Sequence, residues 1–142
     1  MLKRIISTLL ATTLMASCSP EPASQAQASV EPAPPVAKPC PERDPYSACM
    51  ADTSNLETDY QKAMQGDYLA QRNTAWSFSG SSPYVEADPV QACAWRKVIM
   101  VSRPTDARFT DAEQLRIECG KLRPDEVASA EELSARILGA IS

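Results

Sequence analysis

The chain has no histidine and only four glycines among its 142 residues. Histidine is the commonest general base and metal ligand, so its absence argues against most acid–base and metal-dependent catalysis. The few glycines form no nucleophile elbow, no phosphate-binding loop and no dinucleotide-binding turn. Two acid pairs, Asp125-Glu126 and Glu131-Glu132, fall in a first turn or on a polar face of predicted helices. We therefore expect no enzyme activity, no catalytic residue and no cofactor; an enzyme that uses an unrecognised carboxylate pair is the alternative.

A basic run is also missing. The chain has 14 lysines and arginines against 18 acidic residues, a formal net charge of −4. Nucleic acid is therefore not an expected partner, because its backbone is bound by clustered positive charge. The five cysteines include no C-x-x-C pair, so we expect neither a metal site nor a redox-active pair.

No apolar run reaches the roughly 20 residues that a membrane-spanning helix needs. The longest candidate, from Ile5 to Met15, is interrupted by serine and threonine. It follows Lys3 and Arg4 and leads to the small residues Ala16 and Ser17. A basic start, a short apolar core and a small-residue exit are typical of a secretory signal peptide. Residues 1–17 are therefore predicted to be removed on export.

The end of that signal, Leu14-Met15-Ala16-Ser17-Cys18, resembles the lipobox of bacterial lipoproteins. The resemblance implies that Cys18 is acylated, becomes the new N-terminus and holds the protein at a membrane through its acyl chains, of which more than one is needed for stable anchoring. In that family an Asp after the cysteine favours the inner membrane. The chain has Ser19, which implies an outer-membrane lipoprotein facing the periplasm. An ordinary cleaved signal with a cysteine at the junction by chance is the alternative.

Residues 18–48 differ in composition from the rest of the chain. Eight of the 12 prolines lie between residues 19 and 45, among alanine, serine, glutamine and glutamate. Such a segment has too little apolar surface to offset the entropy lost on ordering, and its prolines favour extended, semi-rigid conformations. The predicted organisation is a signal peptide over 1–17, a lipidated, disordered Pro-rich tether over 18–48 and a folded domain over 49–142.

Capping signals and apolar periodicity predict that the domain is all-α, with about five short helices. No segment shows the sustained alternation of a strand. The predicted helices cover residues 54–66, 67–79, 89–102, 110–122 and 124–141. Their predicted starts are a capping box at Ser54 and Glu57, N-caps at Asp67 and Asp88, a second box at Thr110 and Glu113, and Pro124 at a first helical position.

Apolar residues predict how these helices pack. The helix over 89–102 is apolar on nearly all sides, so we expect it to be central. The two tryptophans, Trp76 and Trp95, are expected to be core residues rather than a ligand platform. The last two helices each carry one apolar stripe: Ala112, Leu115, Cys119 and Leu122 on the first, and Ala130, Leu133, Ile137 and Ile141 on the second.

Residues 63–99 resemble one Sel1-like repeat, a short helical hairpin related to tetratricopeptide repeats. The resemblance implies a Sel1/TPR-like bundle of short hairpins, with the last two helices as a degenerate second hairpin. Its small residues would let helices approach closely, and its aromatic residues would fill the space between hairpins. A generic helical bundle with coincidental spacing is the alternative. The residues that carry the motif are Gly66, Asp67, Ala70, Gln71, Phe78, Asp88, Ala92 and Trp95.

The remaining four cysteines are disulfide candidates, because an exported protein meets an oxidising compartment. Three connectivities are possible. Cys93 and Cys119 lie equally far on either side of Asp106, in the turn between two predicted antiparallel helices, so they should lie level and pair. This bond would stabilise the fold by roughly 3–4 kcal/mol in the chain-entropy model. Cys40 and Cys49 would then pair locally.

Together these features predict a lipid-anchored, noncatalytic binding or scaffolding module that presents a groove to another envelope protein. A periplasmic immunity or secretion-system partner is one version of this function. The alternative from another class is a structural envelope lipoprotein without a specific ligand.

Overall fold

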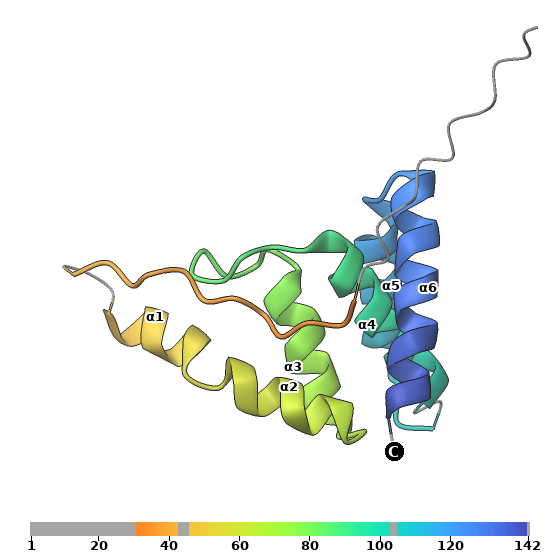
Figure 1. The fold of residues 1–142 in the computed structure, drawn as a ribbon, viewed down its shortest axis with the longest axis horizontal. Helices are drawn as coiled ribbons and strands as arrows, with labels where there is room; N and C mark the ends of the chain where they lie inside the picture. The colour runs from red at the N-terminus through yellow and green to blue at the C-terminus, as the bar shows by residue number, and fades with distance from the viewer. Residues whose placement is uncertain (1–30, 43–45, 103–104, 142) are drawn as a thin grey trace, which may run out of the picture.

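The computed structural model describes residues 31–42, 46–102 and 105–141, and this part of the chain is all-α, as predicted. The predicted signal peptide and Cys18 lie outside the described residues. None of the described helices combines the length and apolar character that crossing a membrane requires. Figure 1 shows the six helices: α1 (Tyr46–Thr53), α2 (Leu56–Met64), α3 (Tyr68–Phe78), α4 (Pro89–Ser102), α5 (Phe109–Gly120) and α6 (Pro124–Ala140).

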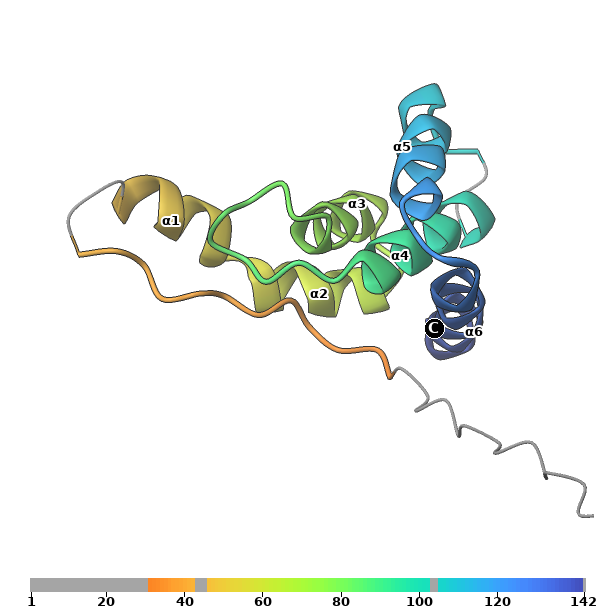
Figure 2. The same cartoon turned by 90° about the horizontal axis from the view of Figure 1, so that it is seen from above.

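Helix α4 is the centre of the molecule, as its apolar sequence predicts. It packs against α3, α5 and α6, while α2 packs against α3. Figures 1 and 2 show α1 at one end of the molecule and α5 and α6 at the other. The ring of Trp95 is fully buried and meets the ring of Tyr60 edge-on, with centroids 6.0 Å apart. The other fully buried residues of α4 are Ala92, Cys93, Ala94, Val98 and Ile99.

Most of the residues of the repeat-like motif lie in the packing of α3 against α4. Ala70, Ala92, Phe78 and Trp95 are buried in one hydrophobic core. Gln71 is also buried and accepts a hydrogen bond from the Ser102 hydroxyl (3.3 Å). The small residues keep the helices close, and the aromatic residues fill the space beside them. This packing is what the motif implies, and a generic helical bundle would show it as well.

Two N-caps form as predicted. The Asp67 carboxylate accepts a hydrogen bond from the Ala70 N–H (2.7 Å), and the Asp88 carboxylate accepts one from the Gln91 N–H (3.0 Å). Gly66, just before Asp67, has a φ of 83°, which glycine adopts without the strain that a Cβ would add. These local interactions set where α3 and α4 begin.

Both predicted capping boxes are wrong. Helix α2 begins after Asn55, and no side-chain bond caps it, so the box at Ser54 and Glu57 does not form. Helix α5 begins one residue before Thr110, and the Arg108 N–H donates to Asp111 at 2.9 Å. Glu113 instead binds Arg116, one turn further along the helix. Asp111 takes the capping role because its side chain is also held by partners from α3.

The segment over 31–42 is not a free tether but lies along the folded part of the chain (Figure 1, orange). Ala37 forms an isolated antiparallel bridge with Val85. The Lys38 N–H donates to the Tyr84 carbonyl (2.8 Å), and the Glu86 N–H donates to the Val36 carbonyl (2.9 Å). The folded part therefore extends N-terminally beyond the predicted boundary at residue 49. Helix α1, which the sequence analysis missed, follows this segment.

The last two helices do not form the expected second hairpin. Both pack mainly against α4. The stripe predicted on α5 is also wrong at Ala112, which is exposed; the two residues that α5 buries are the acids Asp111 and Glu118. On α6 the prediction is better, because Ala130, Leu133 and Ile137 are fully buried and Ile141 is half-buried.

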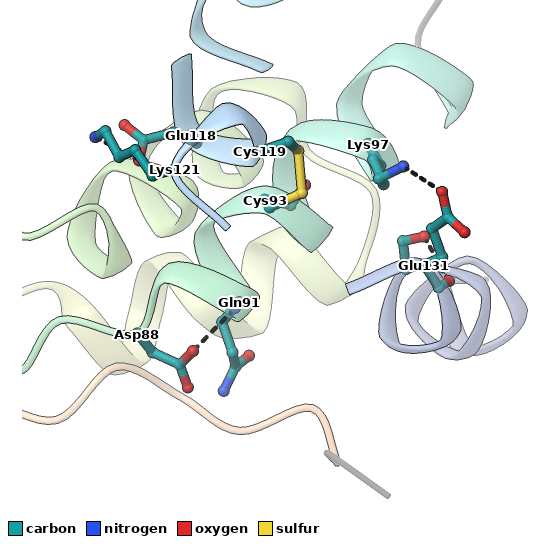
Figure 3. The surroundings of a disulfide bond; sticks show 9 residues. Asp88, Gln91, Cys93, Lys97, Glu118, Cys119, Lys121 and Glu131 are labelled. Carbon is teal, nitrogen blue, oxygen red and sulfur yellow. Dashed lines mark hydrogen bonds and ion pairs between the residues drawn. A yellow bond between two sulfur atoms is a disulfide. The ribbon is translucent and has the colours of Figure 1, made fainter. Parts of the chain in front are cut away.

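The cysteines pair in the connectivity that the hairpin geometry predicts. Cys93 on α4 is bonded to Cys119 on α5, with a Cα–Cα distance of 4.9 Å (Figure 3). Cys40 is bonded to Cys49, with a Cα–Cα distance of 5.8 Å, and this bond joins the 31–42 segment to α1. Both distances lie in the normal range for disulfides.

Candidate functional site

A pocket of about 420 Å³ lies where α3, α4 and α5 meet, with the loop after α3 forming part of its wall. Its volume is in the range of small-ligand sites. Among its lining side chains are two arginines and no carboxylate or histidine. The lining residues are Leu69, Arg72, Asn73, Trp76, Ser81, Arg96, Thr110 and Gln114.

Helix α3 forms one wall of this pocket with its outer face. Leu69, Arg72, Asn73 and Trp76 are spaced so that they share one side of a helix. Leu69 is 62% exposed and Trp76 is 41% exposed. The prediction that Trp76 is a core residue is therefore wrong. The core-facing side of α3 is already filled by its buried alanines and Phe78, so the tryptophan lies on the opposite side.

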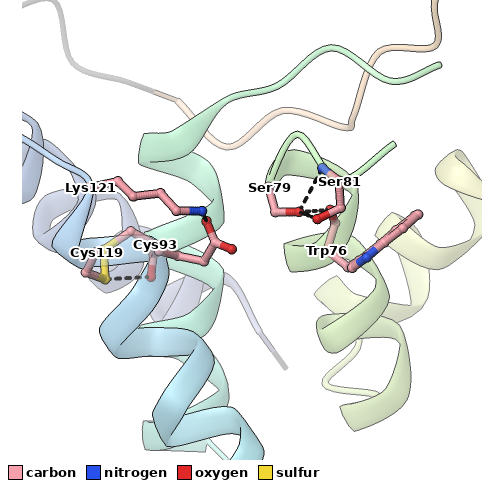
Figure 4. A network of polar contacts seen from close by, with 7 residues as sticks. Trp76, Ser79, Ser81, Cys93, Cys119 and Lys121 are labelled. Carbon is pink, nitrogen blue, oxygen red and sulfur yellow. Dashed lines mark hydrogen bonds and ion pairs between the residues drawn. A yellow bond between two sulfur atoms is a disulfide. The ribbon is translucent and has the colours of Figure 1, made fainter. Parts of the chain in front are cut away.

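A polar network fixes the end of α3 beside Trp76 (Figure 4). The Ser79 hydroxyl donates to the Trp76 carbonyl (2.7 Å), and the Ser81 N–H donates to the Ser79 hydroxyl (3.2 Å). Gly80 between them has a φ of 78°, and a Cβ there would lie 3.3 Å from the Ala87 Cβ. This tight turn places Ser81 on the pocket wall.

Behind the pocket, Asp111 is held by three groups. Its carboxylate lies 2.8 Å from Arg72 Nε and accepts hydrogen bonds from the Tyr68 hydroxyl (2.6 Å) and the Arg108 N–H (2.9 Å). Burial by itself would raise the pKa of Asp111. The two hydrogen bonds and the charges of Arg72 and Arg96 outweigh burial, so the pKa lies below its ordinary value. Asp111 therefore stays ionised and balances Arg72.

Arg96 is different, because no carboxylate of the described residues lies within ion-pair distance of it. The residue is 4% exposed, and among the described residues its Nε has no hydrogen-bond partner. Burial lowers the pKa of Arg96, while the charges of Glu118 and Asp111 act in the opposite direction. Glu118 itself pairs with Lys121 at 3.0 Å (Figure 3). The pocket is thus lined by a buried guanidinium for which the described part of the chain supplies no ion-pair partner.

This site was not predicted from the sequence, because charged residues within helices are usually exposed to solvent. Arg96 lies within the otherwise apolar helix α4, yet it is buried. Asp111 and Glu118 are also buried. A charged residue inside an otherwise apolar helix was the one available signal. The residues predicted to matter lie elsewhere: those of the repeat-like motif and the cysteines do not line the pocket.

Comparison with known proteins gives no relative. No family model, no curated protein and no solved structure matches the chain. The resemblances to lipoproteins at Cys18 and to Sel1-like repeats over 63–99 therefore stay predictions from the sequence.

Proposed function

We propose that the chain is a noncatalytic protein-binding module of the bacterial cell envelope, and that the pocket face of α3, α4 and α5 is its contact surface. Acyl chains on Cys18 would hold it at the outer membrane, facing the periplasm. The observation that carries the proposal is the combination of exposed Leu69 and Trp76 with two arginines at one pocket. Tryptophan and arginine are the residues most enriched at the energetic centres of protein interfaces.

Two further features support the proposal. The two disulfides suit an oxidising compartment, which is where an exported protein would fold. The Arg72–Asp111 pair links α3 to α5 behind the pocket and so holds two of its walls together. Holding a binding surface in place before a partner arrives lowers the entropy lost on binding. The pocket favours a binding module over a structural lipoprotein without a ligand, and the immunity or secretion-system version stays open.

Site-specific photo-crosslinking in intact cells tests this function. A photoreactive amino acid replaces Leu69, which is exposed at the pocket, and in a control strain it replaces Ala135, which is exposed on α6. We expect one discrete protein adduct from position 69 and none from position 135. We also expect Trp76→Ala to abolish the adduct. Equal labelling from both positions, or no adduct from position 69, would contradict the proposal.

A further inference from the structure

We infer that the pocket recognises a single carboxylate, carried by an acidic side chain next to an apolar one on the partner protein, and that Arg96 binds it. This inference rests on the proposed function, since it specifies which part of a partner the pocket face receives.

Arg96 is a buried charge at the wall of this pocket. A charged group that is almost fully buried normally has hydrogen-bonded partners, because burying it unpaired is costly. Arg96 is 4% exposed, its Nε has no described partner, and it lines a pocket. The Nε atom is itself fully buried, so a carboxylate in that pocket would bind the guanidinium through the nitrogens that face the pocket.

The charges around the pocket favour a ligand with a single negative charge. Arg72 already lies 2.8 Å from Asp111, whose lowered pKa keeps it ionised. Among the described residues no carboxylate lies within ion-pair distance of Arg96, since the buried Glu118 pairs with Lys121 and acts on Arg96 only through its charge. One carboxylate matches one unpaired guanidinium, and the planar fork of arginine fits a carboxylate with two parallel hydrogen bonds. A phosphate dianion would bring a second negative charge close to Asp111.

The other side chains of the pocket favour an apolar residue beside the carboxylate. Leu69 and Trp76 offer exposed apolar surface on the same wall, so an apolar side chain beside the acid would have a place to pack. Thr110 and Gln114 add polar atoms that can bond the peptide backbone. The net charge of −4 disfavours nonspecific binding of acidic peptides to the surface as a whole.

A selection experiment with the full chain tests the inference. A random hexapeptide library is selected against the purified, detergent-solubilised protein and against two variants. Gln114→Glu places a negative charge in the pocket, and Gln65→Glu places the same charge at an exposed position just after α2. Thermal melting by circular dichroism checks that both variants fold.

We expect peptides selected by the natural chain and by Gln65→Glu to be enriched in glutamate or aspartate beside an apolar residue. Replacing that acid by its amide should weaken binding at least about tenfold, the effect of losing a charge-assisted hydrogen bond. Folded Gln114→Glu should not enrich acidic peptides. Selected peptides without an acid, or the same acidic peptides from Gln114→Glu, would overturn the inference.

The outcomes also separate this inference from the proposed function. If the selected peptides contain no acid but position 69 still gives an adduct, the carboxylate inference is wrong and the proposed protein-binding face stands. If acidic peptides bind in the pocket but no adduct forms in cells, the proposed protein partner is contradicted and the carboxylate site stands. Binding of inorganic phosphate at Arg96 without binding of acidic peptides would overturn the carboxylate in favour of a phosphate ligand.

Discussion

The Nε atom of Arg72 on α3 lies 2.8 Å from a carboxylate oxygen of Asp111 on α5. This ion pair joins two helices that both contribute residues to the pocket wall. Helices α3 and α5 each pack against α4. The contacts that link α3 directly to α5 at the pocket are polar, because Asp111 binds both Arg72 and Tyr68. Asp111 also accepts a hydrogen bond from the Tyr68 hydroxyl. One buried carboxylate therefore positions α3 relative to α5 at the pocket.

Asp111→Asn should destabilise the protein strongly at neutral pH. Removing one partner of a buried ion pair costs about 3–5 kcal/mol, and the partial exposure of Arg72 favours the lower end. The pKa of Asp111 is lowered in the folded state. Its contribution is thus fully present above the unfolded pKa, near 4, and is lost as the pH falls through the folded pKa.

Urea unfolding at pH 7 and under strongly acidic conditions measures this effect. We expect a gap of about 3 kcal/mol between the natural chain and Asp111→Asn at pH 7, which shrinks as the pH falls below about 4. Asp106→Asn, in the exposed turn before α5, is the matched control and should change little. A variant at position 111 that behaves like the control would show that the pair does not stabilise the fold.

The two arginines of the pocket should respond differently to replacement by methionine. Arg72→Met leaves Asp111 buried without its ion-pair partner and should lower the melting temperature strongly. Arg96→Met removes a buried charge that has no ion-pair partner among the described residues, but it also removes a charge that helps to keep Asp111 ionised, so the melting temperature should fall less than in Arg72→Met. Both variants are compared by calorimetry. A large loss of stability in Arg96→Met would indicate that Arg96 serves the fold rather than a ligand.

Replacing both Cys93 and Cys119 by alanine should lower stability by roughly 3–4 kcal/mol, because their bond closes a loop over a sequence separation of 26. Replacing both Cys40 and Cys49 should cost less, since that separation is nine. Chemical denaturation of the two double variants compares the losses. The reverse order, or a peptide map with other pairings, would contradict the connectivity.

Cys18→Ser should release the protein from the membrane, since the resemblance to a lipobox implies acylation at that residue. Membrane flotation combined with intact mass measurement checks this. A control replacement at the neighbouring Ser19 by alanine should leave both the lipid mass and the flotation unchanged. Flotation of Cys18→Ser with a normal lipid mass would refute the lipoprotein prediction.

The parts of the fold that follow from local chemistry could be predicted from the sequence. Asp67 and Asp88 cap their helices with their own side chains, and Pro124 begins α6. The central position of helix α4 could be predicted because nearly every face of this helix is apolar. The pairing of Cys93 with Cys119 follows from the turn at Asp106, because residues equally far from such a turn lie side by side on the two helices that it joins.

The pocket could not be predicted in the same way, because it depends on contacts between residues far apart in the chain. Asp111 outcompetes the predicted cap at Thr110 because Tyr68 and Arg72 on another helix also hold it. The docking of the 31–42 segment depends on backbone bonds to residues 84–86, which composition does not reveal. Local signals thus fix helix starts, while tertiary partners decide which charges are buried.

The most direct test of the carboxylate site observes Arg96 itself. In the ¹⁵N-labelled full chain, the Nε–H signal of Arg96 is assigned by its absence in Arg96→Met and followed during titration with a selected acidic peptide. We predict a saturable shift of this signal, and no shift with the peptide in which the acid is replaced by its amide. An Arg96 signal that stays unmoved by the acidic peptide, or that moves equally with both peptides, would contradict the account.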